Sequence, residues 1–198
     1  MIKSFDFFFD FTSPYSYLAH KQIRNIENQY KIDINYMPIL LGGLHNLAEI
    51  EAPVFIPLKA KFIIKDCKLF AEKLNIKFKF NSNFPIQSLN LMRGVLIAIK
   101  ENKTSLYIDK FFDACWRDGL NLNNQNVINK ILEDLNFNIE TFKLKISEQN
   151  IKDELKKRTN DAFSKGVFGA PSFIINNKMF WGQDRLEFVL NEAKKIND

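Results

Sequence analysis

Cysteine and histidine are scarce in this 198-residue chain, and their scarcity excludes several kinds of site. The two cysteines, Cys67 and Cys115, lie far apart and form neither a CxxC pair nor a metal-ligand spacing. A disulfide framework is therefore excluded, and a reducing compartment is expected. With only His20 and His45 available, a catalytic zinc site and a Ser-His-Asp hydrolase are both disfavoured.

Glycine, proline and long apolar runs are also scarce. Seven glycines and six prolines argue against a disordered or fibrous chain, and 46% hydrophobic residues are enough for a globular core. No apolar stretch approaches the roughly 20 residues that span a bilayer. The N-terminal segment has no signal-peptide pattern, and no phosphate-binding glycine loop is present. We therefore expect a cytoplasmic protein without a membrane partner.

The net charge of +5 comes largely from lysines that are spread along helical stretches. A basic balance can indicate nucleic-acid binding, but no dense Lys/Arg cluster with interleaved aromatic residues occurs. We interpret the lysines as solvated helix faces and expect no nucleic-acid partner. A mildly positive surface would also suit small anionic ligands.

The periodicity of apolar residues changes twice along the chain. At the start, alternating phenylalanines in residues 5–11 predict a strand, and helical spacing up to about residue 28 follows a break at residues 12–14. Alternation returns in residues 32–36 and stops at Pro38. This β-α-β opening predicts two parallel strands joined by a right-handed crossover.

No strand pattern of comparable strength interrupts residues 44–165, and the strand pattern returns near the end. The middle segments are predicted to be helices near residues 57–74, 89–99, 104–116, 124–133 and 148–163, with Pro57 in a first turn and Thr104 as an N-cap. Residues 173–175 and 178–181 predict a hairpin around Asn176-Asn177, a pair that tolerates positive φ. A last helix follows over residues 186–193.

The order β-α-β, helices, β-β-α predicts an α/β thioredoxin-like fold with a large all-helical insertion. We expect residues 1–43 and 165–198 to form the thioredoxin-like domain, and residues 44–164 to form the helical insertion domain. In such a fold, the functional position lies where the first strand turns into the first helix.

Ser13 occupies that turn, in the sequence Ser13-Pro14-Tyr15-Ser16. The first turn of a helix has unpaired N–H groups, and the helix dipole stabilises an anion there. A serine hydroxyl at this point could donate a hydrogen bond to the thiolate of a bound thiol and lower the pKa of that thiol. Alternatively, Ser13 is simply an N-cap.

Two later segments favour the functional interpretation. Ala170-Pro171 leads into the third strand, where thioredoxin-like folds hold a cis proline, and the backbone of Ala170 is expected to be free to pair with an extended peptide ligand. Asp184 could bind an α-amino group, and Gln183 or Arg185 a carboxylate; glutathione carries both groups. Asp184 could instead be an ordinary helix cap.

These segments together resemble the 2-hydroxychromene-2-carboxylate isomerases, which are relatives of the kappa-class glutathione transferases. The resemblance covers essentially the whole chain; the matching stretches are Phe9 to Ala19, Gly166 to Phe173 and Phe180 to Leu186, and more weakly Leu40 to Gly43, Pro57 to Lys59 and Ala114 to Trp116. The chain is also similar in outline to the periplasmic disulfide oxidoreductases, but it lacks their CxxC.

The resemblance implies a glutathione-dependent isomerase that acts on an aromatic breakdown product, and it implies a homodimer. Ser13 would hold the glutathione thiolate as the catalytic contact. The thiolate would add to a conjugated carbon and leave again after bond rotation. The glutathione contacts implied by the family fall on Ser13, Lys59, Ala170, Pro171, Gln183, Asp184 and Arg185.

Three positions depart from the family pattern, and they leave the substrate open. Ile50 stands where the family has Asn, Cys115 replaces the Tyr of a Tyr-Trp pair, and Asn121 replaces an Asp. A glutathione transferase that conjugates electrophiles is therefore the first alternative, and a non-catalytic glutathione-binding module is the second. His20 is expected on the surface of the first helix, and His45 either at the pocket edge or in a loop.

Overall fold

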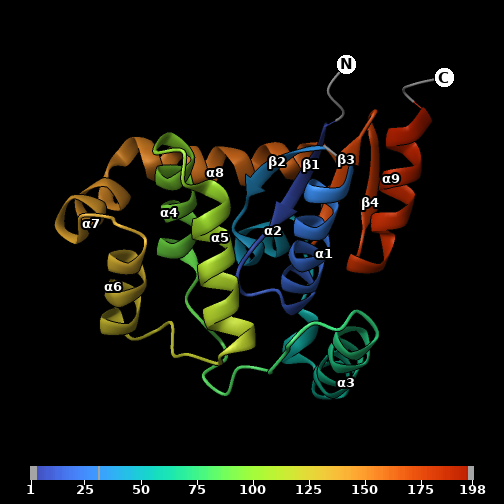
Figure 1. Ribbon diagram of the computed structural model, residues 1–198, viewed down its shortest axis with the longest axis horizontal. Coiled ribbons are helices and arrows are strands. Elements are labelled where there is room, and N and C mark those ends of the chain that lie inside the picture. Colours follow the sequence, from blue (N-terminus) through green and yellow to red (C-terminus); the bar gives the residue numbers. More distant parts are fainter. Residues whose placement is uncertain (1–3, 31, 196–198) are drawn as a thin grey trace.

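A mixed sheet of four strands, in the order β2-β1-β3-β4, organises the part of the chain that the computed structural model describes, residues 4–30 and 32–195 (Figure 1). β1 (Ser4–Phe9) pairs in parallel with β2 (Asp33–Pro38) and antiparallel with β3 (Ser172–Ile175). β3 pairs antiparallel with β4 (Lys178–Trp181). The predicted parallel β-α-β unit and the predicted hairpin are both confirmed.

β1 is buried on both of its faces. Phe5, Phe7 and Phe9 alternate into the main hydrophobic core, as the sequence predicts. Phe8 points to the other face and packs in a smaller cluster with Ile39. Only its first residues on that second face, Ser4 and Asp6, reach solvent.

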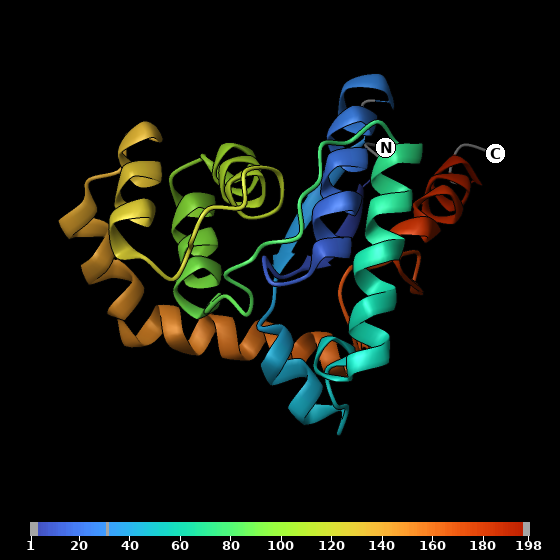
Figure 2. The ribbon, with the colours of Figure 1, turned by 90° about the horizontal axis from the view of Figure 1, so that it is seen from below.

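Helices cover both faces of the sheet (Figures 1 and 2). α1 (Pro14–Tyr30) and α9 (Leu186–Lys194) lie on the face of the main core, and α3 (Pro57–Lys73) runs beside α1. α2 (Leu41–Leu47) and α8 (Gln149–Ser164) cover the opposite face. No helix in the described residues is both long and apolar enough to cross a membrane.

The helices farthest from the sheet, which we call the distal helices, occupy residues 89–147. They are α4 (Leu89–Lys100), α5 (Thr104–Phe112), α6 (Gln125–Asp134) and α7 (Ile139–Ser147). α5 continues into a π-helical turn, Asp113–Arg117. Two short 3₁₀ turns lie elsewhere in the described residues, Pro53–Phe55 and Gln183–Arg185.

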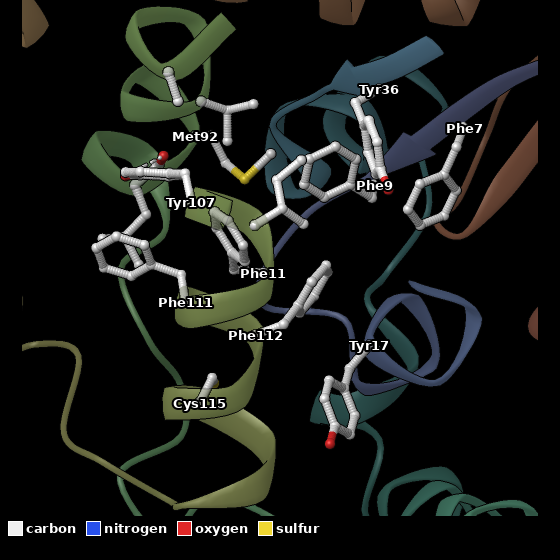
Figure 3. Packing of buried hydrophobic residues seen from close by; sticks show 14 of the residues in the cluster. Phe7, Phe9, Phe11, Tyr17, Tyr36, Met92, Tyr107, Phe111, Phe112 and Cys115 are labelled. Carbon is white, nitrogen blue, oxygen red and sulfur yellow. Dashed lines mark hydrogen bonds between the residues drawn. The ribbon is translucent and has the colours of Figure 1, made fainter. Parts of the chain in front are cut away.

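Aromatic rings join the distal helices to the sheet (Figure 3). Phe112 of α5 lies between both parts, with ring centroids 5.8 Å from Phe9, 4.9 Å from Phe11 and 6.1 Å from Tyr17. Contacts between aromatic rings at these separations stabilise beyond the burial of their area. Phe9, Phe11, Phe111 and Phe112 thus connect the two parts of the fold.

Most predicted elements are confirmed, and the thioredoxin-like fold with its helical insertion with them. Asn176 and Asn177 have the positive φ expected for the hairpin, 50° and 59°. Pro57 opens α3, whereas Thr104 is the first residue of α5 and Lys103 holds the N-cap position. α2 and α7 were not predicted. The outermost residues of the predicted thioredoxin-like domain, 1–3 and 196–198, lie outside the described residues.

His20 is not on the surface, and the prediction that it would be is wrong. Its side chain is fully buried, stacks on Phe112 with centroids 5.2 Å apart, and its Nε2 lies 2.6 Å from Asp109 Oδ1. The distal helices cover the face of α1 that local periodicity left open, and α5 supplies the polar partner. Burial lowers the pKa of His20, so the neutral imidazole donates its Nε2–H to the Asp109 carboxylate.

Candidate active site

Ser13 lies at the junction between β1 and α1. Its N–H donates to the carbonyl of Asp10 at 3.0 Å, which closes the turn, and Pro14 then begins the helix. Ser13 Oγ accepts the N–H of Ser16 at 3.1 Å, which is the hydrogen bond of an N-cap. The hydroxyl is therefore fixed over the first turn of α1, where the helix dipole favours negative charge.

The same hydroxyl reaches a segment 157 residues away in sequence. Ser13 Oγ donates to the carbonyl of Ala170 at 2.9 Å, and the Ala170-Pro171 bond is cis, as predicted. The Ala170 carbonyl is thus not free, contrary to our expectation from sequence. A ligand that accepts the hydrogen bond of the Ser13 hydroxyl must replace the Ala170 carbonyl as its acceptor. The side chain of Ser13 is only 4% exposed, so such a ligand would be held close against both segments.

The side chain of Asp10 stabilises the Ser13 turn. Its carboxylate is fully buried and accepts the N–H of Thr12 at 3.0 Å and that of Leu41, at the start of α2, at 2.8 Å. Burial raises the pKa of Asp10, and these amide hydrogen bonds, together with the hydroxyl of Ser88, act in the opposite direction. One carboxylate thus joins the Ser13 turn to α2.

Two further hydrogen bonds fix the surroundings of the turn. Trp116 donates its Nε1–H to the carbonyl of Phe11 at 2.8 Å, which ties the π-helical turn to the residue before Thr12. Tyr15 donates its hydroxyl to Asp66 Oδ2 at 2.8 Å, which ties α1 to α3. Burial and the nearby carboxylates of Asp66 and Asp184 raise the pKa of Tyr15, so its phenol stays protonated.

Asp184 belongs to the 3₁₀ turn Gln183–Arg185, which packs against α1. Gly182 makes its position possible, because φ is +114° there and a Cβ would lie 2.6 Å from Asp184 Oδ1. The Asp184 side chain is 40% exposed and pairs with Arg185 at 2.9 Å. Both charged groups therefore face solvent at the edge of the turn, where they could meet a charged ligand.

Gln183 has a different environment from its two neighbours. It is 2% exposed, and its side-chain carbonyl accepts the Nε2–H of Gln22 at 3.0 Å. The structure thus places this side chain against α1. Lys59, in contrast, is an exposed residue in the first turn of α3.

The remaining polar candidates lie outside the turn. His45 is half-buried in the last turn of α2, and burial lowers its pKa. Cys67 and Cys115 are buried, and burial raises the pKa of both thiols, that of Cys115 to about 12. Within the described ranges, no cluster of three or more His, Cys, Asp or Glu side chains could hold a metal ion.

Two residues of the predicted motif have a place in the site that sequence reasoning did not assign. Asp10 lies within the matching stretch Phe9 to Ala19, and its position directly after an apolar strand could have indicated a buried role. Ser16 is fully buried, and its hydroxyl has no hydrogen-bond partner in the described part of the chain. The spacing of three residues between Ser13 and Ser16 could have indicated that Ser16 also belongs to the site.

The sheet order, the cis proline and the serine-headed first helix define a thioredoxin-like protein in which serine takes the place of a reactive thiol. A family model for the DsbA-like thioredoxin domain matches residues 4–194. The chain therefore belongs to the DsbA-like thioredoxin family.

Individual relatives cover nearly the whole chain. A 2-hydroxychromene-2-carboxylate isomerase of Sphingobium xenophagum is 27% identical over 195 residues, with 96% of this chain and 97% of the relative aligned. Glutathione S-transferase kappa 1 of Homo sapiens is 24% identical over 204 residues, covering 94% and 89%. A solved structure of 2-hydroxychromene-2-carboxylate isomerase matches the fold with a TM-score of 0.90 at 24% identity, covering 98% and 95%.

Proposed function

We propose that this chain is a glutathione-dependent isomerase of the 2-hydroxychromene-2-carboxylate type, which acts on an intermediate of aromatic degradation by cis-trans isomerisation. The observation that carries the proposal is the position of the Ser13 hydroxyl, fixed between the first turn of α1 and the cis Ala170-Pro171 segment. The relatives named 2-hydroxychromene-2-carboxylate isomerase, aligned over nearly their whole length, support it.

The residues around the turn fit glutathione. Ser13 offers a donor to sulfur, and Asp184 offers an exposed carboxylate for the α-amino group, in a position that a side chain at Gly182 would prevent. Arg185 and Lys59 would meet the carboxylates. The buried hydroxyl of Ser16 lacks a hydrogen-bond partner among the described residues, which also favours a ligand at this turn.

The chain's own residues would bind and polarise the thiol. Ser13 would turn its proton from the Ala170 carbonyl to the sulfur and, with the dipole of α1, lower the pKa of the thiol. Ala170 and Pro171 would hold the cysteinyl part beside α1. When bound, glutathione supplies a nucleophile that adds reversibly to a conjugated carbon, so that the former double bond can rotate before the nucleophile leaves. Glutathione is regenerated unchanged.

An ultraviolet titration of glutathione thiolate tests this proposal. Wild type should lower the pKa of bound glutathione, and Ser13→Ala should raise it again by about 1–2 units, because a hydrogen bond to a charged group contributes about 1.5–3 kcal/mol. Ser172→Ala is the matched control, because it removes a buried hydroxyl that donates to the Gly169 carbonyl and not to Ala170. It should leave the pKa of bound glutathione unchanged. A wild type that leaves the thiol pKa at its solution value contradicts the proposal.

A kappa-type transferase that conjugates glutathione to electrophiles is the second candidate. It is favoured by the departures from the isomerase pattern outside the Ser13 turn: Cys115 is fully buried behind Asn81, and Ile50 is an apolar side chain 37% exposed. Mass balance separates the two functions. An isomerase returns all of its glutathione after many turnovers, whereas a transferase consumes one molecule per product.

We also propose that the protein acts as a homodimer. Apolar side chains are exposed together on the 3₁₀ turn before α3 and on α3 itself, with Phe55 62%, Leu58 80% and Phe62 64% exposed. Burying such a patch is favourable, and monomeric proteins rarely leave large ones open. Sedimentation equilibrium should give twice the chain mass for wild type and a weakened dimer for Phe62→Ser.

A further inference from the structure

Tyr15 and Asp66 join two helices beside the candidate site through a contact that the proposed chemistry does not yet use. The Tyr15 hydroxyl donates to Asp66 Oδ2 at 2.8 Å, where α1 packs against α3. Tyr15 is the second residue of α1 and follows Ser13 by two positions. The bond therefore lies at the end of α1 that begins at the Ser13 turn.

α3 begins well before the level at which it meets Tyr15. The two helices lie side by side and run in the same general direction (Figure 2). Asp66 is the tenth residue of α3, whereas Tyr15 is the second residue of α1. The nine residues of α3 that precede Asp66 span about 13 Å, at a rise of about 1.5 Å per residue. These residues, 57–65, therefore extend beyond the start of α1, and we call them the α3 extension.

The α3 extension is much less buried than the rest of the helix. Five of its first six residues are exposed, and the buried residues of α3, Cys67 and Ala71, both come after Asp66. Within the extension, Ile63 packs partly buried against the main core. The bond between Tyr15 and Asp66 therefore lies where the packed part of α3 gives way to its exposed part.

Lys59 lies on the side of the α3 extension that is turned toward α1. Lys59, Ile63 and Asp66 are spaced by four and three residues, which places them along one side of a helix. Ile63 contacts the main core and Asp66 bonds to Tyr15, so this side faces α1. Lys59 is exposed and lies beyond the start of α1, so its ammonium can reach the space beside the Ser13 turn.

We propose that Tyr15 and Asp66 are positioning residues that act through Lys59. Their hydrogen bond holds the α3 extension beside the Ser13 turn and keeps the Lys59 ammonium where one carboxylate of glutathione can pair with it. Without the bond, the extension can move away from α1, whereas Ser13 and the first turn of α1 keep their own hydrogen bonds. This inference rests on the proposed glutathione site and concerns how tightly that site holds its ligand.

A double-mutant cycle between Tyr15 and Lys59 tests whether they act on the same contact. Lys59→Met should raise the Kd for glutathione about two- to fivefold, as for the loss of an exposed ion pair. Tyr15→Phe removes only the hydroxyl and should raise the Kd by no more than that factor. Because both changes weaken one ion pair, the double variant should bind no more weakly than Lys59→Met alone. In Tyr15→Phe, the pKa of bound glutathione should keep its wild-type value.

Tyr17→Phe is the matched control. Tyr17 also belongs to α1, and its hydroxyl donates to the carbonyl of Lys77 at 2.7 Å, which lies after the end of α3. Both tyrosine variants lose one hydroxyl hydrogen bond, so both should lower Tm by about 2–4 °C. Only Tyr15→Phe should raise the Kd for glutathione.

The experiment is a calorimetric titration of glutathione into wild type, the three single variants and the Tyr15→Phe/Lys59→Met double variant, with a thermal melt of each. The expected result is a raised Kd for Tyr15→Phe that adds nothing in the presence of Lys59→Met. An unchanged Kd in either single variant, effects that multiply in the double variant, or an equal effect of Tyr17→Phe overturns the role of Tyr15 and Asp66, while binding by wild type still supports the glutathione site. If wild type does not bind glutathione, the proposed function fails and this role with it.

Discussion

The Ser13 turn and the distal helices are held in place by different interactions. Around Ser13, polar groups bond to backbone groups of remote segments: Asp10 to Leu41, Ser13 to Ala170, and Trp116 to Phe11. The distal helices are packed mainly through rings, such as Tyr107 against Phe111 at 4.5 Å and Phe137 against Phe142 at 5.2 Å.

If the proposed function is correct, this difference separates the thiol activation at Ser13 from the selection of the substrate. Directional hydrogen bonds fix the positions of single atoms, which thiol activation requires. Packing between rings tolerates substitution by side chains of another shape as long as their volume is similar. The stretches that match the isomerase pattern strongly lie at the sheet end, and two of the three departures, Cys115 and Asn121, lie in residues 89–147. The two regions can therefore be perturbed separately, except where a ring joins them.

The largest effect is expected where the two regions meet. Phe112→Ala should lower the free energy of unfolding by about 3–5 kcal/mol, because a buried ring in contact with Phe9, Phe11 and Tyr17 is lost. Denaturant titration followed by circular dichroism measures the change. If the site and the distal helices fold as one unit, a single transition moves to lower denaturant.

Leu144→Ala is the control for this substitution, because Leu144 belongs to α7 and is 71% exposed. Its effect should stay within about 0.5 kcal/mol. Two separate unfolding transitions in the Phe112→Ala variant would contradict this prediction. They would show that the distal helices unfold independently of the sheet.

A thiol placed at the Ser13 position should show how strongly the turn stabilises negative charge. In Ser13→Cys the new thiol lies at the start of α1, so its pKa should fall below about 7.5, as for cysteines at helix N-termini. The thiolate fraction at pH 7 should then be at least about sevenfold larger than for a free cysteine of pKa about 8.5, and iodoacetamide labelling followed by mass spectrometry should be correspondingly faster.

Ser172→Cys provides the matched comparison, because Ser172 is equally buried but lies in β3. It should remain unlabelled in the folded protein, like the native buried thiols Cys67 and Cys115. Equal labelling of both variants would mean that the helix start contributes nothing to thiolate stability.

The fold was predictable because its signals are local. Alternating phenylalanines indicate β1, and Asn176-Asn177 indicates the hairpin, without reference to any remote residue. α7 escaped prediction because Phe142, Leu144 and Ile146 alternate as in a strand, and tertiary contacts of Phe142 with Tyr107 and Phe137 decide the helix instead.

The site was predictable only in part, because most of its bonds join distant segments. Ser13 could be found from its position before Pro14, and the cis bond of Pro171 from the fold. The bond of Ser13 to Ala170, the double anchor of Asp10 and the burial of His20 against Asp109 depend on partners that no local pattern specifies.

His20 allows a pH test of the contact between α1 and the distal helices. Its folded pKa is lowered by burial, so the unfolded chain takes up a proton first as pH falls below about 6.5. The contribution of His20 to the free energy of unfolding should therefore be at its maximum above pH 7. It should decrease by at most about 2 kcal/mol as the pH falls to 5. Denaturant titrations at several pH values measure this slope.

His20→Gln should flatten that pH dependence, because glutamine keeps a donor for Asp109 but cannot be protonated. His45→Gln is the comparison, since His45 is only half-buried and should account for a smaller part of the slope. A His20→Gln variant with the wild-type slope would show that His20 is not held neutral in the fold.

The smallest effect is expected at Ile50, where the family pattern has an asparagine. Ile50 is 37% exposed, so Ile50→Asn should change the free energy of unfolding by no more than about 0.5 kcal/mol. If the proposed glutathione site extends to this turn, the new amide adds one polar contact and should tighten the Kd for glutathione about two- to tenfold in calorimetry. Leu47→Asn, at a neighbouring apolar residue 41% exposed, should leave the Kd unchanged. A gain at Ile50 alone would place this residue in the glutathione site, whereas equal results for both variants would confine that site to the Ser13 turn and its immediate neighbours.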